Sequence, residues 1–298
     1  NFPELNFIIK IFYPTLFQKF QINSQTFRKF LSGFFIIILI FSNSSDILSQ
    51  GKKYPFNISA WFSALSINKS DQDIADVNLN LFYSDIGTIN TFNTGLGFQK
   101  VENNFNGVNL FAGVTAINGK SGGFLLSAIG NLHIGGVKGL EIGGLFNTAA
   151  SSFEGLQIAG TVNYTAEKFT GSQMSLVVNI AGDNFSGAQF GNSNIVGSNM
   201  KGLQFGTTFN AVSKNMSGLQ IAPGNIAGTN DGVQIGLINV NSVNNILQFG
   251  LVNITDYQKG VPIGAVNIAT KNGGASWINF SSNFAAVTTG LKINAAKF

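Results

Sequence analysis

The chain contains no cysteine, a single histidine and little charge. The absence of cysteine excludes disulfides, thiolate metal ligands and a lipid-modified cysteine. Charged residues make up 10% of the chain, far below the roughly 25% that is usual for soluble domains. Because Lys and Arg form no basic stripe, nucleic acid is not an expected partner.

Little in the sequence points to catalysis or to metal binding. His133 has neither cysteines nor an acidic cluster near it, so we expect a structural histidine and no zinc site or catalytic triad. Asp71, Asp73 and Asp76 have the spacing of a calcium loop but lack its glycine and its final Glu, which predicts a solvated loop. The glycines form no phosphate-binding motif. We therefore predict no catalytic residue, no metal site, no cofactor and no enzymatic activity.

Residues 28–50 have the organisation of a secretory signal peptide. Two basic residues precede an apolar run over 30–41, and a polar stretch follows it. The apolar run is too short for the roughly 20 residues that a membrane helix needs. The segment therefore predicts export, and we interpret residues 1–27 as non-native or as an overlong start of the signal.

Residues 107–273 consist of about eleven tandem repeats of 14 to 16 residues. Each repeat begins with a glycine, and Ile246 fills one glycine slot. These glycines are Gly107, Gly123, Gly139, Gly155, Gly171, Gly187, Gly202, Gly218, Gly232 and Gly260. Two positions later stands a glutamine in most repeats: Gln157, Gln173, Gln189, Gln204, Gln220, Gln234 and Gln248. An asparagine recurs seven or eight positions after the glycine: Asn131, Asn147, Asn163, Asn179, Asn194, Asn210, Asn225, Asn239, Asn253 and Asn267.

Within a repeat, apolar and polar residues alternate, which is typical of β-strands. In residues 171–180 the apolar set is Met174, Leu176, Val178 and Ile180. No stretch after residue 50 has a convincing helical period, so the fold class is predicted to be all-β. We expect the phenylalanine column of Phe105, Phe153, Phe169 and Phe185 to form an aromatic ladder in the core.

Two all-β architectures fit these repeats, and a β-solenoid is favoured. Stacked coils reward the same amide in every repeat, because Asn and Gln side chains then hydrogen-bond along the stack. The glycine-to-asparagine spacing also drops from eight to seven in some repeats, which a turn between two short strands absorbs. The alternative is an antiparallel β-barrel of the outer-membrane type, which the low charge and the alternating stretches of about ten residues would suit.

The two ends of the chain after residue 50 depart from the repeat. Residues 51–106 and 274–298 contain strand-like stretches without the regular columns. Repeat arrays need atypical ends to cover their last coils. We therefore predict an N-terminal and a C-terminal β cap, and we expect the latter to be truncated.

The repeats resemble a known family. Residues 155–163 read GLQIAGTVN and residues 232–240 read GVQIGLINV. Both are similar to the G-[LV]-Q-[IL]-x-G-x-V-N-[IV] unit of a bacterial surface-repeat family first named from Leptospira and found in Gram-negative bacteria. The resemblance implies a cell-surface or outer-membrane location and no particular activity.

These observations predict an exported, non-catalytic structural or interaction protein at the cell surface. Its stacked Gln and Asn columns would form an exposed polar face for an unknown partner protein or glycan. The alternative function is an outer-membrane β-barrel that acts as a pore or scaffold. Association with the outer membrane would fit either function.

Overall fold

The structure is a computed structural model that describes residues 51–59, 73–272, 275–276 and 292–293. The chain divides into two units, Asn1–Leu48 and Ser49–Phe298, and every described residue belongs to the second. The described residues form strands and turns without a helix, so none of them belongs to a helix that could cross a membrane. The predicted signal peptide at 28–50 and the segment 1–27 lie outside the described residues.

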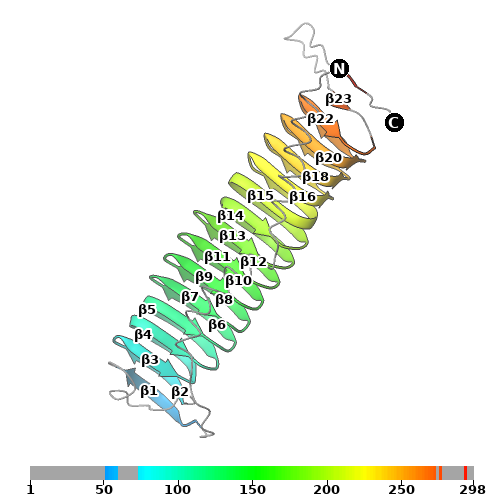
Figure 1. The fold of residues 1–298 in the computed structure, drawn as a ribbon. Coiled ribbons are helices and arrows are strands. Elements are labelled where there is room, and N and C mark those ends of the chain that lie inside the picture. The colour runs from blue at the N-terminus through cyan, green and yellow to red at the C-terminus, as the bar shows by residue number, and fades with distance from the viewer. Residues whose placement is uncertain (1–50, 60–72, 273–274, 277–291, 294–298) are drawn as a thin grey trace. The chain divides into compact units, whose positions relative to one another are not determined.

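Successive coils of the chain stack in a row, and each coil contributes to two rows of strands (Figure 1). The first row holds β1 (Lys53–Ser59), β2 (Ile74–Asn80), β6 (Ser121–Ser127), β8 (Val137–Gly143), β10 (Phe153–Ala159), β12 (Phe169–Ser175), β17 (Val233–Ile235), β19 (Leu247–Phe249) and β21 (Val261–Ile263). The second row holds β3 (Tyr83–Ile86), β7 (Gly130–His133), β9 (Phe146–Ala149), β11 (Val162–Thr165), β13 (Val178–Ala181), β16 (Gly224–Asn230), β18 (Ile238–Asn244), β20 (Val252–Gln258) and β22 (Val266–Ala269). Long strands that bend through both rows are β4 (Thr88–Val101), β5 (Phe105–Ile117), β14 (Phe185–Val196) and β15 (Met200–Ile221).

The strands of successive coils pair in parallel and in register. Gln157 pairs with Gln173 in the first row, and Asn163 pairs with Asn179 in the second. This arrangement confirms the predicted β-solenoid. The alternative antiparallel barrel is wrong, because neighbouring repeats run in the same direction.

Some repeats have seven instead of eight positions between the glycine and the asparagine. The structure accommodates this difference at the bend between the two rows. Gly191 pairs with Gly206, but Ser193 already pairs with Phe209, so the register shifts between them. Asn194 is back opposite Asn210 immediately afterwards. The asparagines therefore remain paired with one another from coil to coil, as the spacing predicted.

The two ends of the stack differ from each other in how their strands pair. At the start, β1, β2 and β4 join the stack through parallel pairs that lead directly to β5. At the other end, β23 (Ala275–Ser276) pairs with β22 in the antiparallel sense, and β24 (Lys292–Ile293) pairs with β23 in the same way. The other residues of the predicted C-terminal cap lie outside the described part of the chain.

The repeated glycine occupies a backbone conformation that other residues rarely adopt. Gly155 has a φ of 137°, and a Cβ there would lie 1.9 Å from the carbonyl oxygen of Gly139 in the preceding coil. Gly232 and Gly260, in the 14-residue repeats, no longer have φ in this region. The conformational requirement for glycine is therefore absent at these two positions, and Ile246 takes the slot between them.

One end of each coil interior is apolar. The rings of Phe153 and Phe169 stack with centroids 5.1 Å apart, and those of Phe169 and Phe185 with centroids 5.4 Å apart. The larger buried cluster comprises Val137, Ala149, Phe153, Phe169, Ala181, Phe185, Val196, Met200, Val212, Met216 and Ala227. Phe105 lies in a second cluster nearer the N-terminus with Ala75, Ile86, Ile89, Val101, Ile117 and Leu125. The predicted aromatic ladder is thus confirmed for Phe153, Phe169 and Phe185, whereas Phe105 is buried in the core without joining it.

Replacing a stacked glycine tests this packing. Gly155→Ala should lower the free energy of unfolding by at least about 1–3 kcal/mol from the unfavourable φ alone, with the backbone overlap adding to it. Gly136→Ala is the matched control, because a Cβ there would meet nothing nearer than 3.6 Å. Urea unfolding followed by circular dichroism measures both, and equal effects of the two variants would contradict the packing described.

Candidate functional site

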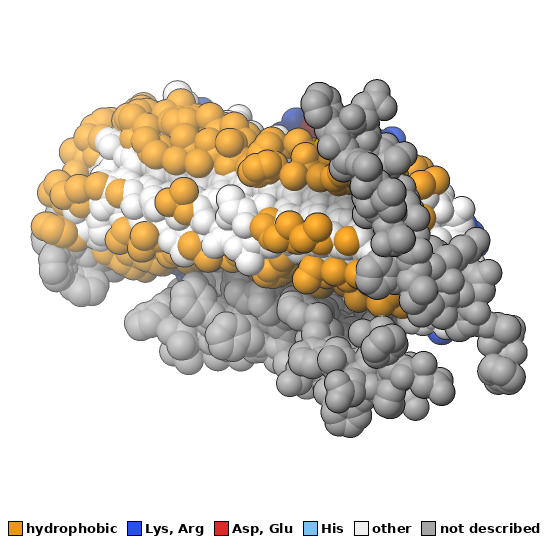
Figure 2. Space-filling view, turned by 90° about the horizontal axis from the view of Figure 1, so that it is seen from above, with side chains coloured by type: hydrophobic (Ala, Val, Ile, Leu, Met, Phe, Trp, Pro, Cys, Tyr) orange, Lys and Arg blue, Asp and Glu red, His pale blue; other side chains and the backbone are white. Residues whose placement is uncertain are grey.

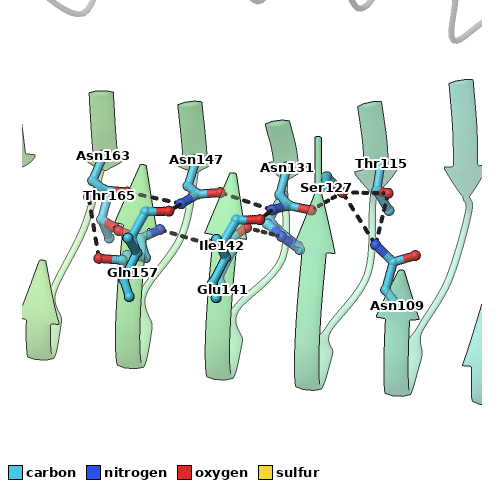
Figure 3. Close-up of polar contacts among 12 residues, drawn as sticks. Asn109, Thr115, Ser127, Asn131, Glu141, Ile142, Asn147, Gln157, Asn163 and Thr165 are labelled. Carbon is cyan, nitrogen blue, oxygen red and sulfur yellow. Dashed lines mark hydrogen bonds and ion pairs between the residues drawn. The ribbon is translucent and has the colours of Figure 1, made fainter. Parts of the chain in front are cut away.

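The asparagine column forms a hydrogen-bonded ladder inside the coils. Nδ2 of Asn147 donates to Oδ1 of Asn163 at 3.0 Å (Figure 3), and Asn163 donates to Asn179 in the same way at 3.0 Å. Nδ2 of Asn163 also donates to the carbonyl oxygen of Met174 in the next coil at 2.7 Å. Each asparagine therefore joins its own coil to the following one through both side chain and backbone.

This ladder is continuous and has one direction. It begins at Asn57 and passes through Asn78 and Asn93, every amide donating toward the C-terminus, and it ends at Asn267. The members up to Asn109 lie in the first row, whereas Asn131 and its successors lie in the second.

The ladder crosses from one row to the other through hydroxyl groups. Nδ2 of Asn109 lies 3.1 Å from Oγ1 of Thr115 and 3.3 Å from Oγ of Ser127 (Figure 3). Ser127 then donates to Asn131 at 2.7 Å. The crossing explains why Asn109 stands where later repeats have glutamine, whereas Leu125 at the same position of the next repeat lies in the N-terminal apolar cluster.

The glutamine column forms a second ladder that runs the opposite way. Nε2 of Gln173 donates to Oε1 of Gln157 at 2.9 Å, and Gln189 donates to Gln173 at 2.8 Å. The last acceptor is Glu141, whose Oε2 accepts from Gln157 at 2.9 Å. The next residue in the column toward the N-terminus is the apolar Leu125. A carboxylate fits the end of this ladder because it can accept without needing an onward acceptor.

Glu141 also contacts the single histidine. Nε2 of His133 lies 2.6 Å from Oε1 of Glu141, and both side chains are fully buried. Among the described residues, no group of three or more His, Cys, Asp or Glu side chains lies close enough to hold a metal ion. Glu141 accepts from Gln157 with one oxygen and contacts His133 with the other, so the pair closes the end of the glutamine ladder. The contact was not predicted from the sequence, although a Glu in a column of glutamines was the available signal.

The predicted exposed platform of Gln and Asn is wrong. Gln157, Gln173, Asn163 and Asn179 are all 0% exposed. Their donors and acceptors are used within the ladders or by backbone carbonyls, which makes burial of these amides tolerable. No partner or glycan can reach these columns without opening the coil.

The exposed charges of the array lie along one edge of the coils. Between residues 105 and 272, every charged side chain except Glu141 stands within four positions before the glycine slot. We call this the charged edge: Lys120, Lys138, Glu154, Glu167, Lys168, Asp183, Lys201, Lys214, Asp231, Asp256, Lys259 and Lys271. Lys138 and Glu154 in adjacent coils form an ion pair of 3.2 Å.

The opposite part of the outer surface is apolar. Between residues 105 and 272, all but three of the strongly exposed large apolar side chains stand one to six positions after the glycine slot. We call this the apolar face: Val108, Leu110, Leu126, Ile129, Leu145, Met174, Leu176, Val177, Phe205, Ile235, Leu237, Ile238, Phe249, Leu251 and Val261. The three exceptions are Ile134, Ile246 and Tyr257. Figure 2 shows rows of hydrophobic side chains along the surface in view, with charged groups only at its margins.

A small charged network lies near the N-terminal end of the stack. Lys100 forms ion pairs with Asp85 at 3.7 Å and with Glu102. Burial lowers the pKa of Lys100, but the hydrogen bond to Glu102 and the charges of Asp85 and Glu102 outweigh it and raise the pKa overall. Burial together with Asp85 also raises the pKa of Tyr83. Because both groups hold their protons more tightly, neither is suited to act as a base or nucleophile near neutral pH.

The predicted solvated loop is wrong for its described residues, because Asp76 lies within β2 and Asp73 is buried. Asp73 is buried and accepts a hydrogen bond from the backbone nitrogen of Lys52 at 3.0 Å. Asp76 instead pairs with Lys53 at 3.4 Å. Asp71 lies outside the described residues.

No protein-family model matches the chain, and no curated protein sequence or solved structure matches it either. Function therefore has to be inferred from the residues of the coils.

The asparagine ladder can be tested with two matched alanine variants. Asn179→Ala should lower the free energy of unfolding by at least about 2 kcal/mol, since each buried polar group left unpaired costs about 1–3 kcal/mol. Asn184→Ala is the control in the same repeat, because its amide oxygen accepts only exposed hydrogen bonds, from Nδ2 of Asn199 at 2.9 Å and from the backbone nitrogen of Asn199 at 3.3 Å. We expect this control to change stability by less than about 0.5 kcal/mol. Similar losses in both variants would argue against a buried ladder.

A double-mutant cycle tests the buried His133–Glu141 pair. His133→Leu should destabilise the protein by about 3–5 kcal/mol, because removing one partner leaves a buried carboxyl group incompletely paired. Adding Glu141→Gln, which restores the amide that later repeats carry, should recover part of this loss. Urea unfolding of the wild type, both single variants and the double variant measures the coupling, and strictly additive effects would contradict it.

Proposed function

We propose that this chain is a non-catalytic structural and interaction protein of the bacterial cell surface. The coils supply a stable, repetitive framework, and their outer surface is the part available to partners. Partners contact the outer surface of the coils and not the buried Gln and Asn columns.

The observation that carries the proposal is the division of roles between the inside and the outside of the coils. Inside, the amides of the two ladders satisfy one another, as the 2.9 Å bond between Asn194 and Asn210 illustrates. Outside, the members of the apolar face and of the charged edge keep the same positions relative to the glycine slot in the coils that carry them. A surface that repeats from coil to coil suits extended contact better than it suits a single reaction centre.

The location rests on two features of the sequence. Residues 28–50 have the organisation of a secretory signal. The repeats also resemble the bacterial surface-repeat family, and that resemblance implies a surface or outer-membrane location in Gram-negative bacteria. We infer export to the cell surface from these two features together.

The location can be tested with the full chain, tagged at its C-terminus and expressed in a Gram-negative host. We expect a shortened N-terminus by mass spectrometry and digestion of the tag when intact cells are treated with protease. Ile37→Asp, within the apolar run of the predicted signal, should leave the protein uncleaved in the cytoplasm. Ile8→Asp, the same change outside that run, should not.

Two results would overturn the proposed location. One is a wild-type chain that keeps its full N-terminus and stays in the cytoplasm. The other is equal export of the Ile37→Asp and Ile8→Asp variants.

A further inference from the structure

We propose that the apolar face of the array lies against a lipid surface. The inference rests on the proposed surface role and names the partner that the outer surface would contact. It starts from the reversed polarity of the coils, which place amides inside and large apolar side chains outside.

The reversal is clearest in the 14-residue repeats. In the coil that starts at Gly232, the buried side chains include Gln234, Asn239 and Asn244. The outward Leu237 and Ile238 in the same coil are 54% and 49% exposed. Monomeric proteins in water rarely expose continuous apolar areas of more than a few hundred Å², so a face of this kind indicates a contact.

The charges of the array favour lipid as the partner. The charged edge and the apolar face occupy different positions of the repeat, and none of the charged side chains between 105 and 272 lies within the apolar face. This separation matches elements that lie in a membrane interface, with apolar groups among the acyl chains and charged groups in water.

The shape of the apolar face also favours lipid over a second protein surface. The face covers the outer side of the first row of strands and continues around the turn toward the second row, as Ile235 and Leu237 illustrate. It is therefore convex. A rigid flat partner would cover one side of such a corner, whereas a fluid phase can cover both.

The composition of the outer columns points the same way. Inside, the same amide recurs from coil to coil, whereas outside only apolarity is kept: Leu126, Met174 and Phe205 share one position in different repeats. Packing against a protein requires complementary shape, but burial in lipid requires only apolar area. The outer columns meet the second requirement.

The apolar face is interrupted at the turn in several coils, and Gly160 and Thr161 already lie between Leu145 and Leu176. Asn192 accepts a hydrogen bond from Thr207 at 3.2 Å and another from Thr208. Leu145 and Leu176 lie in repeats before this polar group, and Leu237 and Leu251 lie in repeats after it. We therefore place the lipid contacts of the turn at the individual coils that carry Leu145, Leu176, Leu237 and Leu251.

Flotation with phosphatidylcholine vesicles tests the proposal on the full chain. We expect the wild type to float with the vesicles and to remain bound in 1 M NaCl, because apolar burial is insensitive to screening. A triple variant with Leu145→Ser, Leu237→Ser and Leu251→Ser should lose at least about tenfold in partition coefficient.

The matched control places the same change outside the apolar face. Ile134→Ser, Ile246→Ser and Tyr257→Ser together remove three side chains that are 45%, 49% and 43% exposed. This control should bind vesicles like the wild type. Residues 1–50 are the same in all the proteins, so their contribution cancels.

A second measurement does not depend on a triple variant. Because the chain has no cysteine, a polarity-sensitive dye can be attached at Leu176→Cys, which replaces a side chain that is 78% exposed. Its emission should shift to the blue when vesicles are added. The same dye at Glu154→Cys, on the charged edge, should not respond.

Four outcomes would overturn the proposal. They are no flotation of the wild type, equal loss in the two triple variants, equal dye response at both positions, and a blue shift at position 176 that follows protein concentration without vesicles. The last outcome would identify a second copy of the chain as the partner. Failure here would leave the cell-surface location standing, since export is tested separately by signal cleavage and protease access.

Discussion

The buried amide ladders are the interaction on which the rest of this structure depends. An Asn or Gln side chain carries both a donor and an acceptor, so one amide in each coil can accept from one neighbour and donate to the other. This works only when successive coils run in the same direction and keep their register. The ladder that starts at Asn57 holds this arrangement through to Asn267.

A polar interior also determines the outside of the coil. Each strand alternates between inward and outward positions, so a strand that points Gln157 inward must point Leu156 and Ile158 away from the interior. Only the end near Phe153 and Phe169 keeps an apolar core. The outer surface consequently carries apolar side chains, and the charges gather at the remaining edge.

The sequence predicted much of the fold and little of the candidate site. The repeated columns were enough to favour parallel stacking, because identity at each position has value only there. Alternation shows which residues share a side of a strand but not which side is inside, and amides such as Gln173 are usually exposed. The predicted polar platform failed for that reason. The contact of His133 with Glu141 joins adjacent coils, so it required the register of the strands to be known.

Hydrogen exchange of the side-chain amides, followed by NMR after selective labelling of asparagine, tests the buried ladders most directly. The NH₂ groups of Asn163 and Asn179 should be protected, because both are fully buried and hydrogen-bonded. The exposed NH₂ group of Asn199, which donates to Asn184, should exchange freely. Equally fast exchange at all three positions would contradict the account.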